Sequence, residues 1–385
     1  MEALIYKYEH KLSEAGLTSE GAPLMGALDA ELLWNRHDRK TPFLEMIFKK
    51  LNITALLFSE PKEPYRTIID HLCRSSSGTI FPEDSETRTF LHDLPVTDGL
   101  DDTRVVSLLK QRKCVLIPGH GIIAFGTVSP EQAFITYSSV CFATFVKFFS
   151  DMLFKKKRGM ISGEESMIFR RVRNMLDAPI PNAPMLARSP FSDEQEMVRA
   201  IEEAGKEVVR YGLVDSYFGN ISYCFRNTLY ISQTSSSLDE LVGCIDPCPL
   251  DGSSCAGITA SSELLTHLEI AKTSGAKAIL HGHPKFAVII SMDCDRDDCP
   301  TRGLCHRRCP EKRYLDNIPI VPGEVGTGPF GLCNTVPSAV AEANGVIVYG
   351  HGVFTTGISD FNEAFSRLLT IENRARAEYF RRFDE

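Results

Sequence analysis

The stretch Ala278-Ile-Leu-His-Gly-His-Pro-Lys285 places two histidines one residue apart at the end of an apolar run. In a β-strand, side chains two residues apart point to the same face, so His281 and His283 would present two imidazoles side by side. The pair is therefore a candidate for metal binding. Taken alone it is a weak motif, because packed or solvent-facing histidines account for many such spacings.

Three further segments of the second half supply matching chemistry. YFGNISYCF followed by LYISQTSSSLDEL predicts a strand, a short turn and another strand over residues 217–241. TASSELLTHLEIAK predicts a loop entering a helix, with Glu263 near the helix start, and YGHGVFTTG places His351 between a buried strand and a glycine turn. Three imidazoles can fix a catalytic zinc and leave a fourth position open, while a nearby carboxylate serves as general base.

Each segment also has a purely structural interpretation. GNIS could be a tight turn that closes a hairpin. The run Ser261-Ser262-Glu263 could be a helix cap with an acidic first turn, and His267 inside that helix is expected to be packed rather than a ligand. The ordered set is more specific than its parts, so a zinc-type site is the leading prediction. The hydroxyl-rich loops and the helix start also offer donors suited to a phosphate.

The composition describes an acidic globular chain. Its 385 residues, 43% of them hydrophobic, exceed one typical core and suit two domains. The formal charge of −8 argues against a nucleic-acid binder, which would show a basic face. No apolar run approaches the length of a membrane span, and the start, MEALIYKYEHKLSEAG, predicts an amphipathic helix rather than a secretion signal. We therefore expect a cytoplasmic protein with no membrane and no nucleic-acid partner.

The two halves of the chain share a pattern. VLIPGHGIIAFGTVSPEQAF from Val115 aligns without gaps to VIVYGHGVFTTGISDFNEAF from Val346, and ITALLFSEPK matches AKAILHGHPK upstream. Two matches in the same order predict that one fold is present twice. In the first half Phe58 and Glu60 replace the histidine pair, and His120 is the one histidine of the three that survives.

This repeat sets the expected domain boundaries. Residues 1–155 should form a degenerate domain that lacks the histidine pair, and residues 191–385 the catalytic domain. The charge runs and prolines of residues 156–190 predict a helix and a linker between them. Because the first half shows no evident equivalent of residues 217–241, we expect that hairpin in the second half only.

The motifs together resemble a known family. GNIS, the ISQTSSSLDEL loop, SSE followed by HLEI, HGHP and the GHGVFTTG turn are similar to those of the class II aldolase/adducin family, in the same order. The resemblance covers residues 192–385, with residues 40–150 as a degenerate second copy. It implies an α/β fold of three layers, α/β/α, around a central, largely antiparallel sheet. Members include aldolases, an epimerase and a dehydratase acting on sugar phosphates, and adducin, which is not an enzyme.

Carried over residue by residue, the resemblance makes His281, His283 and His351 the ligands of Zn2+ or another divalent metal. Glu263 becomes the general acid/base that deprotonates the carbon beside the metal-bound carbonyl. One departure is Gly323, which stands where many relatives carry a tyrosine that assists proton transfer. The remaining motif residues would contact a substrate phosphate, and they are Gly219, Asn220, Thr234, Ser235, Ser261 and Ser262.

The cysteines need an explanation of their own. Seven of the twelve fall between Cys244 and Cys309. An insertion near residues 292–313, within SMDCDRDDCPTRGLCHRRCPEKR, has few apolar residues from which to build a core. It predicts a structural zinc, an iron–sulfur cluster or a disulfide, with unpaired surface thiols as the alternative. Its four thiols belong to Cys294, Cys299, Cys305 and Cys309.

The leading functional prediction is a zinc-dependent aldolase-type lyase. It would cleave or form a C–C bond in a small, phosphorylated hydroxy-carbonyl compound through a metal-stabilised enediolate. Epimerisation, dehydration and decarboxylation use the same chemistry and are alternatives, as is a non-catalytic, adducin-like assembly protein. The first half suits an assembly role: a homo-oligomer of two chains could form a pseudo-fourfold ring.

Overall fold

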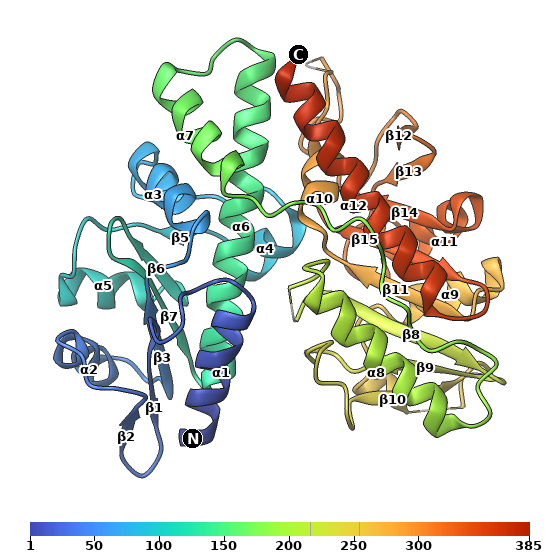
Figure 1. Ribbon diagram of the computed structural model, residues 1–385, viewed down its shortest axis with the longest axis horizontal. Coiled ribbons are helices and arrows are strands. Elements are labelled where there is room, and N and C mark those ends of the chain that lie inside the picture. The colour runs from blue at the N-terminus through green and yellow to red at the C-terminus, as the bar shows by residue number, and fades with distance from the viewer. Residues whose placement is uncertain (216, 254, 297) are drawn as a thin grey trace. The chain divides into compact units, whose positions relative to one another are not determined.

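The chain of this computed structural model folds into two compact units (Figure 1). Unit 1 comprises Met1–Asp177 and unit 2 comprises Ala178–Glu385. The structure describes residues 1–215, 217–253, 255–296 and 298–385. Each unit has its own sheet and its own helical layers.

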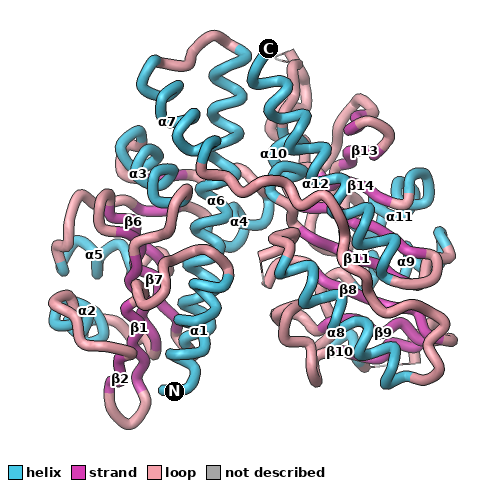
Figure 2. The backbone as a smooth tube through the Cα atoms, viewed as in Figure 1, coloured by secondary structure: helices cyan, strands magenta, loops and turns pink. Residues whose placement is uncertain are grey.

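Unit 1 is a sheet covered by helices. Its strands are β1 (Leu24–Leu28), β2 (Leu32–Trp34), β3 (Ala55–Ser59), β4 (Thr79–Ile80), β5 (Leu94–Pro95), β6 (Cys114–Ile117) and β7 (Gly121–Gly126). Its helices are α1 (Glu2–Glu14), α2 (Thr41–Lys50), α3 (Tyr65–Ser75), α4 (Ser85–Leu91), α5 (Asp102–Leu109), α6 (Pro130–Lys157) and α7 (Gly163–Asn174). The antiparallel sheet has the order β2-β1-β3-β7-β6, and β4 and β5 form a separate pair. Figure 2 distinguishes the strands of this unit from its helices. Helix α6 packs on β3 and β7, while apolar residues of α2 and α5 share a core with the strands.

Unit 2 has the three layers expected from the sequence. Its strands are β8 (Asn220–Phe225), β9 (Thr228–Ser232), β10 (Ile245–Pro249), β11 (Ala278–Gly282), β12 (Arg313–Leu315), β13 (Ile318–Val321), β14 (Gly345–Val348) and β15 (Gly352–Gly357). Its helices are α8 (Glu194–Arg210), the short η1 (Ala256–Ile258), α9 (Leu264–Ser274), α10 (Lys285–Met292), α11 (Leu332–Ala343) and α12 (Phe361–Asp384). The sheet order is β10-β9-β8-β11-β15-β14-β13-β12, with β13 and β14 as a parallel pair in an otherwise antiparallel sheet. Helices α9 and α11 pack together on one side, and α12 contacts β11, β15, α8 and α10 (Figure 1).

Local sequence explains where the helices of this unit begin. The Asp193 side chain accepts a hydrogen bond from the Glu196 N–H at 2.9 Å, which caps α8. Gly212 adopts a φ of 65° just beyond the helix, a conformation that favours glycine. The apolar stripe of α8 faces the core, and its buried members include Met197, Ile201, Ala204 and Val208.

Five strands of unit 2 repeat the arrangement of unit 1. The order β9-β8-β11-β15-β14 corresponds to β2-β1-β3-β7-β6. The pairing registers also correspond, because His281 lies opposite Phe354 just as Phe58 lies opposite Ile123. The aligned sequence blocks therefore occupy equivalent places in two equivalent sheets.

The expectation that unit 1 lacks the hairpin of residues 217–241 is wrong. Strands β1 and β2 form that hairpin, and Leu24 lies opposite Phe58 just as Asn220 lies opposite His281. The sequences of the two hairpins have diverged so far that alignment does not reveal their relation. Backbone pairing preserves the hairpin because strand geometry requires only suitable apolar faces.

The segment predicted to be a helix and a linker contains α7, and no further helix or strand of the described residues lies between α7 and α8. Helix α7 belongs to unit 1, where the Arg171 side chain pairs with Glu63 at 3.1 Å. The segment after Asp177 belongs to unit 2, where the Leu186 N–H donates to Asn362 Oδ1 at 2.9 Å.

Helix α6 corrects the statement that no apolar run approaches a membrane span. Its 28 residues are long and apolar enough to cross a membrane by length and composition. However, 83% of the apolar window is buried inside the protein. Because it packs against β3, β7, α1 and α3, α6 is the central core helix of unit 1.

Candidate metal centre

Three buried histidines of unit 2 converge on one point. His281 lies near the end of β11, His283 follows that strand, and His351 lies in the turn between β14 and β15. One ligand nitrogen from each residue lies within 4.8 Å of the others, and all three side chains are buried. The Nε2 atoms of His281 and His283 are 3.0 Å apart. Nitrogens this close suit ligands that share one cation, so these residues could hold a metal.

The backbone fixes which nitrogen of His281 faces the other two histidines. Its Nδ1 lies 3.1 Å from the carbonyl oxygen of Val353, which can only accept a hydrogen bond. The proton therefore resides on Nδ1, and the Nε2 lone pair points toward the centre. The ring of Phe354 stacks on the imidazole with centroids 3.9 Å apart, which further restricts its orientation.

The Glu263 carboxylate lies directly beside the histidines, at the N-cap position of α9. Its Oε1 is 3.1 Å from His351 Nε2, and its Oε2 is 3.5 Å from His281 Nε2. Burial raises the pKa of Glu263, but the neighbouring imidazoles and the Asn220 amide lower it by more, so its pKa lies well below the ordinary range. The carboxylate is thus ionised.

A chain of buried polar groups leads away from this carboxylate. Asn220 Nδ2 donates to Glu263 Oε2 at 2.9 Å, and Asn220 Oδ1 is in hydrogen-bond contact with His267 Nε2. His267 Nδ1 lies 2.7 Å from the Ser222 hydroxyl. Burial lowers the pKa of His267 to about 3, so this imidazole is neutral. His267 lies outside the group of possible metal ligands, which agrees with the prediction that it is not a ligand. The role of Ser222 was not predicted from the sequence.

Helix α10 connects two of the metal-ligand segments. In its first turn, the N–H groups of Phe286 and Ala287 donate to the half-buried Glu372 carboxylate of α12 at 3.0 and 2.9 Å. Near its other end, the Ser291 hydroxyl accepts a hydrogen bond from the Gly350 N–H at 2.8 Å. Because α10 begins two residues after His283 and Gly350 precedes His351, these contacts hold both histidine segments in place. Neither Glu372 nor Ser291 belongs to a motif that sequence inspection would select.

The hydroxyl-bearing residues predicted to bind phosphate lie on two loops, which are joined by backbone hydrogen bonds. The Thr234 N–H donates to Thr259 O at 2.9 Å, and the Ser261 N–H donates to Ser232 O at 3.0 Å. The exposed side chains of Thr234, Ser235 and Ser262 and the buried Ser261 therefore come from adjacent segments. Both polar groups of the Asn220 side chain already have protein partners.

Two glycines of the motifs are required by close packing. Gly219 adopts a φ of 78°, and a Cβ there would lie 2.4 Å from His281 O. A Cβ on Gly323 would lie 2.6 Å from Leu332 Cδ2, so a larger residue at this position would require the Leu332 side chain to move. Ser235 adopts a φ of 59°, in the left-handed region where a residue with a side chain is uncommon.

Within the part of the chain that the structure describes, the thiols of the cysteine-rich insertion do not come together as a group of metal ligands. Among the described residues, the three histidines are the group that brings three ligand atoms within 4.8 Å of one another. Every cysteine of the chain has a free thiol, and Asp297 of the insertion lies outside the described residues. The structure therefore gives no support for a metal held by Cys294, Cys299, Cys305 and Cys309.

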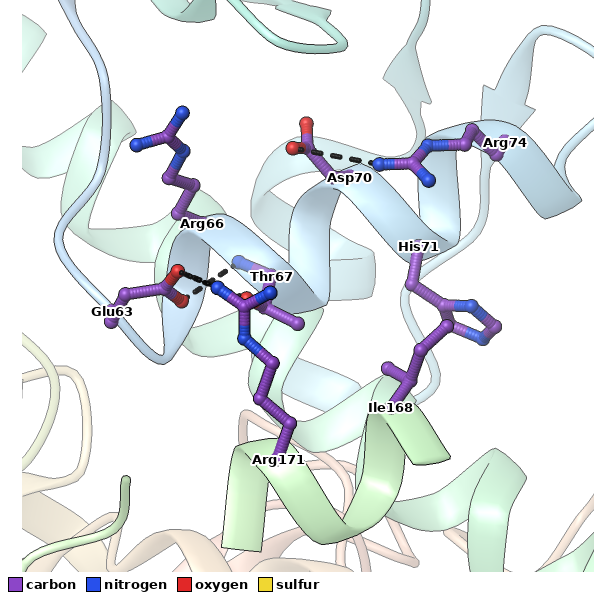
Figure 3. Close-up of a pocket in the computed structure, with 8 residues that line it drawn as sticks. All are labelled: Glu63, Arg66, Thr67, Asp70, His71, Arg74, Ile168 and Arg171. Atoms are coloured by element: carbon purple, nitrogen blue, oxygen red, sulfur yellow. Dashed lines mark hydrogen bonds and ion pairs between the residues drawn. The ribbon is translucent and has the colours of Figure 1, made fainter. Parts of the chain in front are cut away.

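A hollow in unit 1 has a different character. It has a volume of about 340 Å³ and lies between α3 and α7 (Figure 3). Most of its charged side chains are paired: Arg171 pairs with Glu63, Arg74 lies 3.8 Å from Asp70, and Arg66 pairs with Glu60 outside the hollow. This hollow contains none of the residues predicted to act in catalysis or binding.

Comparison with known proteins points to unit 2. Residues 199–379 match the family described as Class II Aldolase and Adducin N-terminal domain. The solved L-fuculose-1-phosphate aldolase from Thermus thermophilus is 24% identical, with 49% of this chain and 95% of that chain covered and a TM-score of 0.40.

Two further solved structures are similar at lower identity. YgbL from Escherichia coli, a protein of suggested aldolase, epimerase or decarboxylase activity, is 20% identical, with 48% and 89% covered and a TM-score of 0.40. A sugar-phosphate aldolase from Thermotoga maritima is 20% identical, with 49% and 94% covered and a TM-score of 0.35. No curated protein sequence matches this chain.

Proposed function

Because residues 199–379 belong to the class II aldolase and adducin family, we propose that unit 2 is a zinc-dependent aldolase-type lyase. Its substrate would be a small, phosphorylated hydroxy-carbonyl compound such as a sugar phosphate. The observation that carries this proposal is the convergence of three buried imidazoles with one ionised carboxylate. Ligand sets of three histidines with an open fourth position are typical of catalytic rather than structural zinc.

The residues of this chain divide the work between them. His281, His283 and His351 would hold the metal, which when bound supplies Lewis-acid polarisation of a carbonyl oxygen. In the bond-forming direction, Glu263 accepts the proton from the carbon beside that carbonyl. In the cleavage direction, the ionised Glu263 takes the proton of the hydroxyl on the departing carbon as the C–C bond breaks and the aldehyde forms, and it then gives this proton to the carbon beside the carbonyl. Burial of Glu263 keeps bulk water from competing for this proton.

The two hydroxyl-bearing loops would bind the substrate phosphate. Thr234, Ser235 and Ser262 are exposed on adjacent segments and can donate hydrogen bonds to phosphate oxygens. Position 323 is a glycine and supplies no side-chain proton donor, so Glu263 is the proton carrier that we assign to this unit.

The direct test uses L-fuculose 1-phosphate with the zinc-loaded protein, following aldehyde release. We expect metal-dependent release that stops on chelation and returns on addition of zinc. L-Rhamnulose 1-phosphate and L-ribulose 5-phosphate serve as parallel substrates. If the zinc-loaded protein releases aldehyde from none of the three substrates, the lyase proposal is overturned, and an epimerase, a dehydratase or a decarboxylase is favoured.

Unit 1 supports a separate proposal about assembly. Its sheet repeats that of unit 2, whereas Phe58 replaces the first metal ligand. We propose that unit 1 is a non-catalytic copy that occupies alternate positions in a homo-oligomeric ring, so that two chains form a pseudo-fourfold assembly in the cytoplasm. A fully active monomer by light scattering would overturn this proposal.

A further inference from the structure

A line of three buried side chains, those of Ser222, His267 and Asn220, ends on the Glu263 carboxylate. Ser222 and Asn220 lie two residues apart on β8, and therefore on one face of that strand. His267 reaches them from α9, one turn beyond Glu263. All four side chains are buried, so each polar group must find its partner within the protein.

The chemistry of these groups permits one consistent set of protons. The Glu263 carboxylate only accepts hydrogen bonds, so the Asn220 amide must turn its N–H toward Glu263 and its oxygen toward His267. His267 must then carry its proton on Nε2 and accept through Nδ1. The Ser222 hydroxyl, 2.7 Å from Nδ1, donates to it. Each group thus fixes the orientation of the next.

From this geometry we infer that Ser222 and His267 are positioning residues for the proton carrier. They prevent the Asn220 amide from reversing, so that an N–H and not an oxygen faces Glu263 Oε2. The other carboxylate oxygen, Oε1, is left toward His351 and the metal centre. This inference rests on the proposed function for its catalytic consequence, but not for the hydrogen-bond chain itself.

Unit 1 supplies the natural counterexample. The residues at the matching positions are Gly26 for Ser222, Leu24 for Asn220 and Leu44 for His267. Leu24 and Leu44 belong to one apolar core cluster, and a Cβ on Gly26 would lie 2.7 Å from the ring of Trp34. Where the carboxylate is absent, the whole chain of polar groups that leads to it is absent as well. Its polar character is therefore not a requirement of the fold.

The test compares His267→Leu, which copies Leu44, with His267→Gln and Ser222→Ala. We expect every variant to keep about one zinc per chain, because the three ligands are untouched. The kcat for L-fuculose 1-phosphate should fall about 10- to 100-fold in His267→Leu, with KM changed by less than about twofold. His267→Gln should recover most of the loss, because its amide can still donate to Asn220. Thr266→Val, a buried change in the same helix, controls for repacking.

Equal losses in His267→Leu and His267→Gln, or no loss in either, would overturn the inference. A second measurement is independent of turnover: ¹⁵N-histidine NMR of the zinc-loaded protein should show His267 as the neutral Nε2–H tautomer. A proton on Nδ1 of His267 would contradict the proposed hydrogen-bond chain, even if the protein is an active lyase. If NMR shows the expected tautomer but the protein cleaves none of the three sugar phosphates, the hydrogen-bond chain is retained and the proposed function is removed.

Discussion

The same place in the two sheets of this protein contains two opposite kinds of chemistry. In unit 2 the Glu263 carboxylate lies 3.5 Å from His281. In unit 1 the matching helix-cap residue is Lys40, and its Nζ lies 4.4 Å from the ring centroid of Phe58, the counterpart of His281. A cation against an aromatic face replaces an anion beside a buried imidazole. Unit 1 at this point has neither a base nor a pair of ligands.

The comparison also shows what the fold requires. Phe58, Leu24 and Leu44 share one apolar core cluster in unit 1, whereas their counterparts in unit 2 are buried polar groups that must satisfy each other. An apolar core is the simpler way to fill this space, because buried polar groups cost free energy unless they are paired. The fold alone therefore does not require these polar groups in unit 2.

The largest effect is expected from removing the base that unit 1 lacks. Glu263→Gln keeps the shape of the side chain and the zinc ligands, but it can no longer accept a proton. Aldehyde release should fall about 100- to 10,000-fold, with zinc content unchanged by elemental analysis. Undiminished activity in this variant would place the proton carrier elsewhere and remove the main chemical contrast between the units.

A smaller effect is expected from the support behind the ligands. Glu372→Ala removes the acceptor for two N–H groups in the first turn of α10, which should lower the free energy of unfolding by about 1–3 kcal/mol in urea titrations. Zinc affinity should weaken about tenfold, because His283 lies two residues before the start of this helix. The matched control is Glu378→Ala, which removes a carboxylate from the surface side of α12, the helix that also contains Glu372. This change should leave zinc affinity unchanged. Equal zinc affinities in the two variants would mean that α10 does not position His283.

Introducing a ligand into unit 1 should weaken it without creating a site. Phe58→His places a polar ring in an apolar cluster and should cost about 1–3 kcal/mol of unfolding free energy. The zinc content should stay at one per chain, since Glu60 and an exposed His120 do not complete a set of three imidazoles. The same change at Phe90, which is 43% exposed, is the matched control. A gain of a second zinc would show that unit 1 has retained a latent site.

The smallest effect is expected in the cysteine-rich insertion. Changing its four cysteines to serine should leave zinc content and aldehyde release unaltered, because the structure does not bring these thiols together. Loss of a metal equivalent in this variant would restore the structural zinc or iron–sulfur cluster predicted from the sequence. The four positions are Cys294, Cys299, Cys305 and Cys309.

The sequence predicted the parts of the site that depend on short motifs. His281 and His283 follow from strand periodicity, and Glu263 follows from its place at a helix start. The repeat of the two halves was also visible, because strands β3, β6 and β7 retain the lengths and apolar patterns of their counterparts. These features involve residues close together in the chain or blocks aligned without gaps.

The parts that escaped prediction depend on contacts between distant segments. His267 meets Asn220 across 47 positions, and Glu372 meets Phe286 across 86. No local pattern distinguishes a histidine that orients an amide from one that merely packs. The hairpin of β1 and β2 was missed because its residues had changed, and α6 was overlooked as a long apolar helix because polar residues interrupt its sequence.

The most direct test of the account is elemental analysis of the purified protein, prepared anaerobically, beside the double variant His281→Ala/His283→Ala. Because the metal centre is assigned to these residues and His351, the wild type should contain about one zinc per chain and the variant should lose it. Metal that remains unchanged in the variant would contradict the account, since the ion would then belong to the cysteines and the histidine cluster would be no more than a packed core.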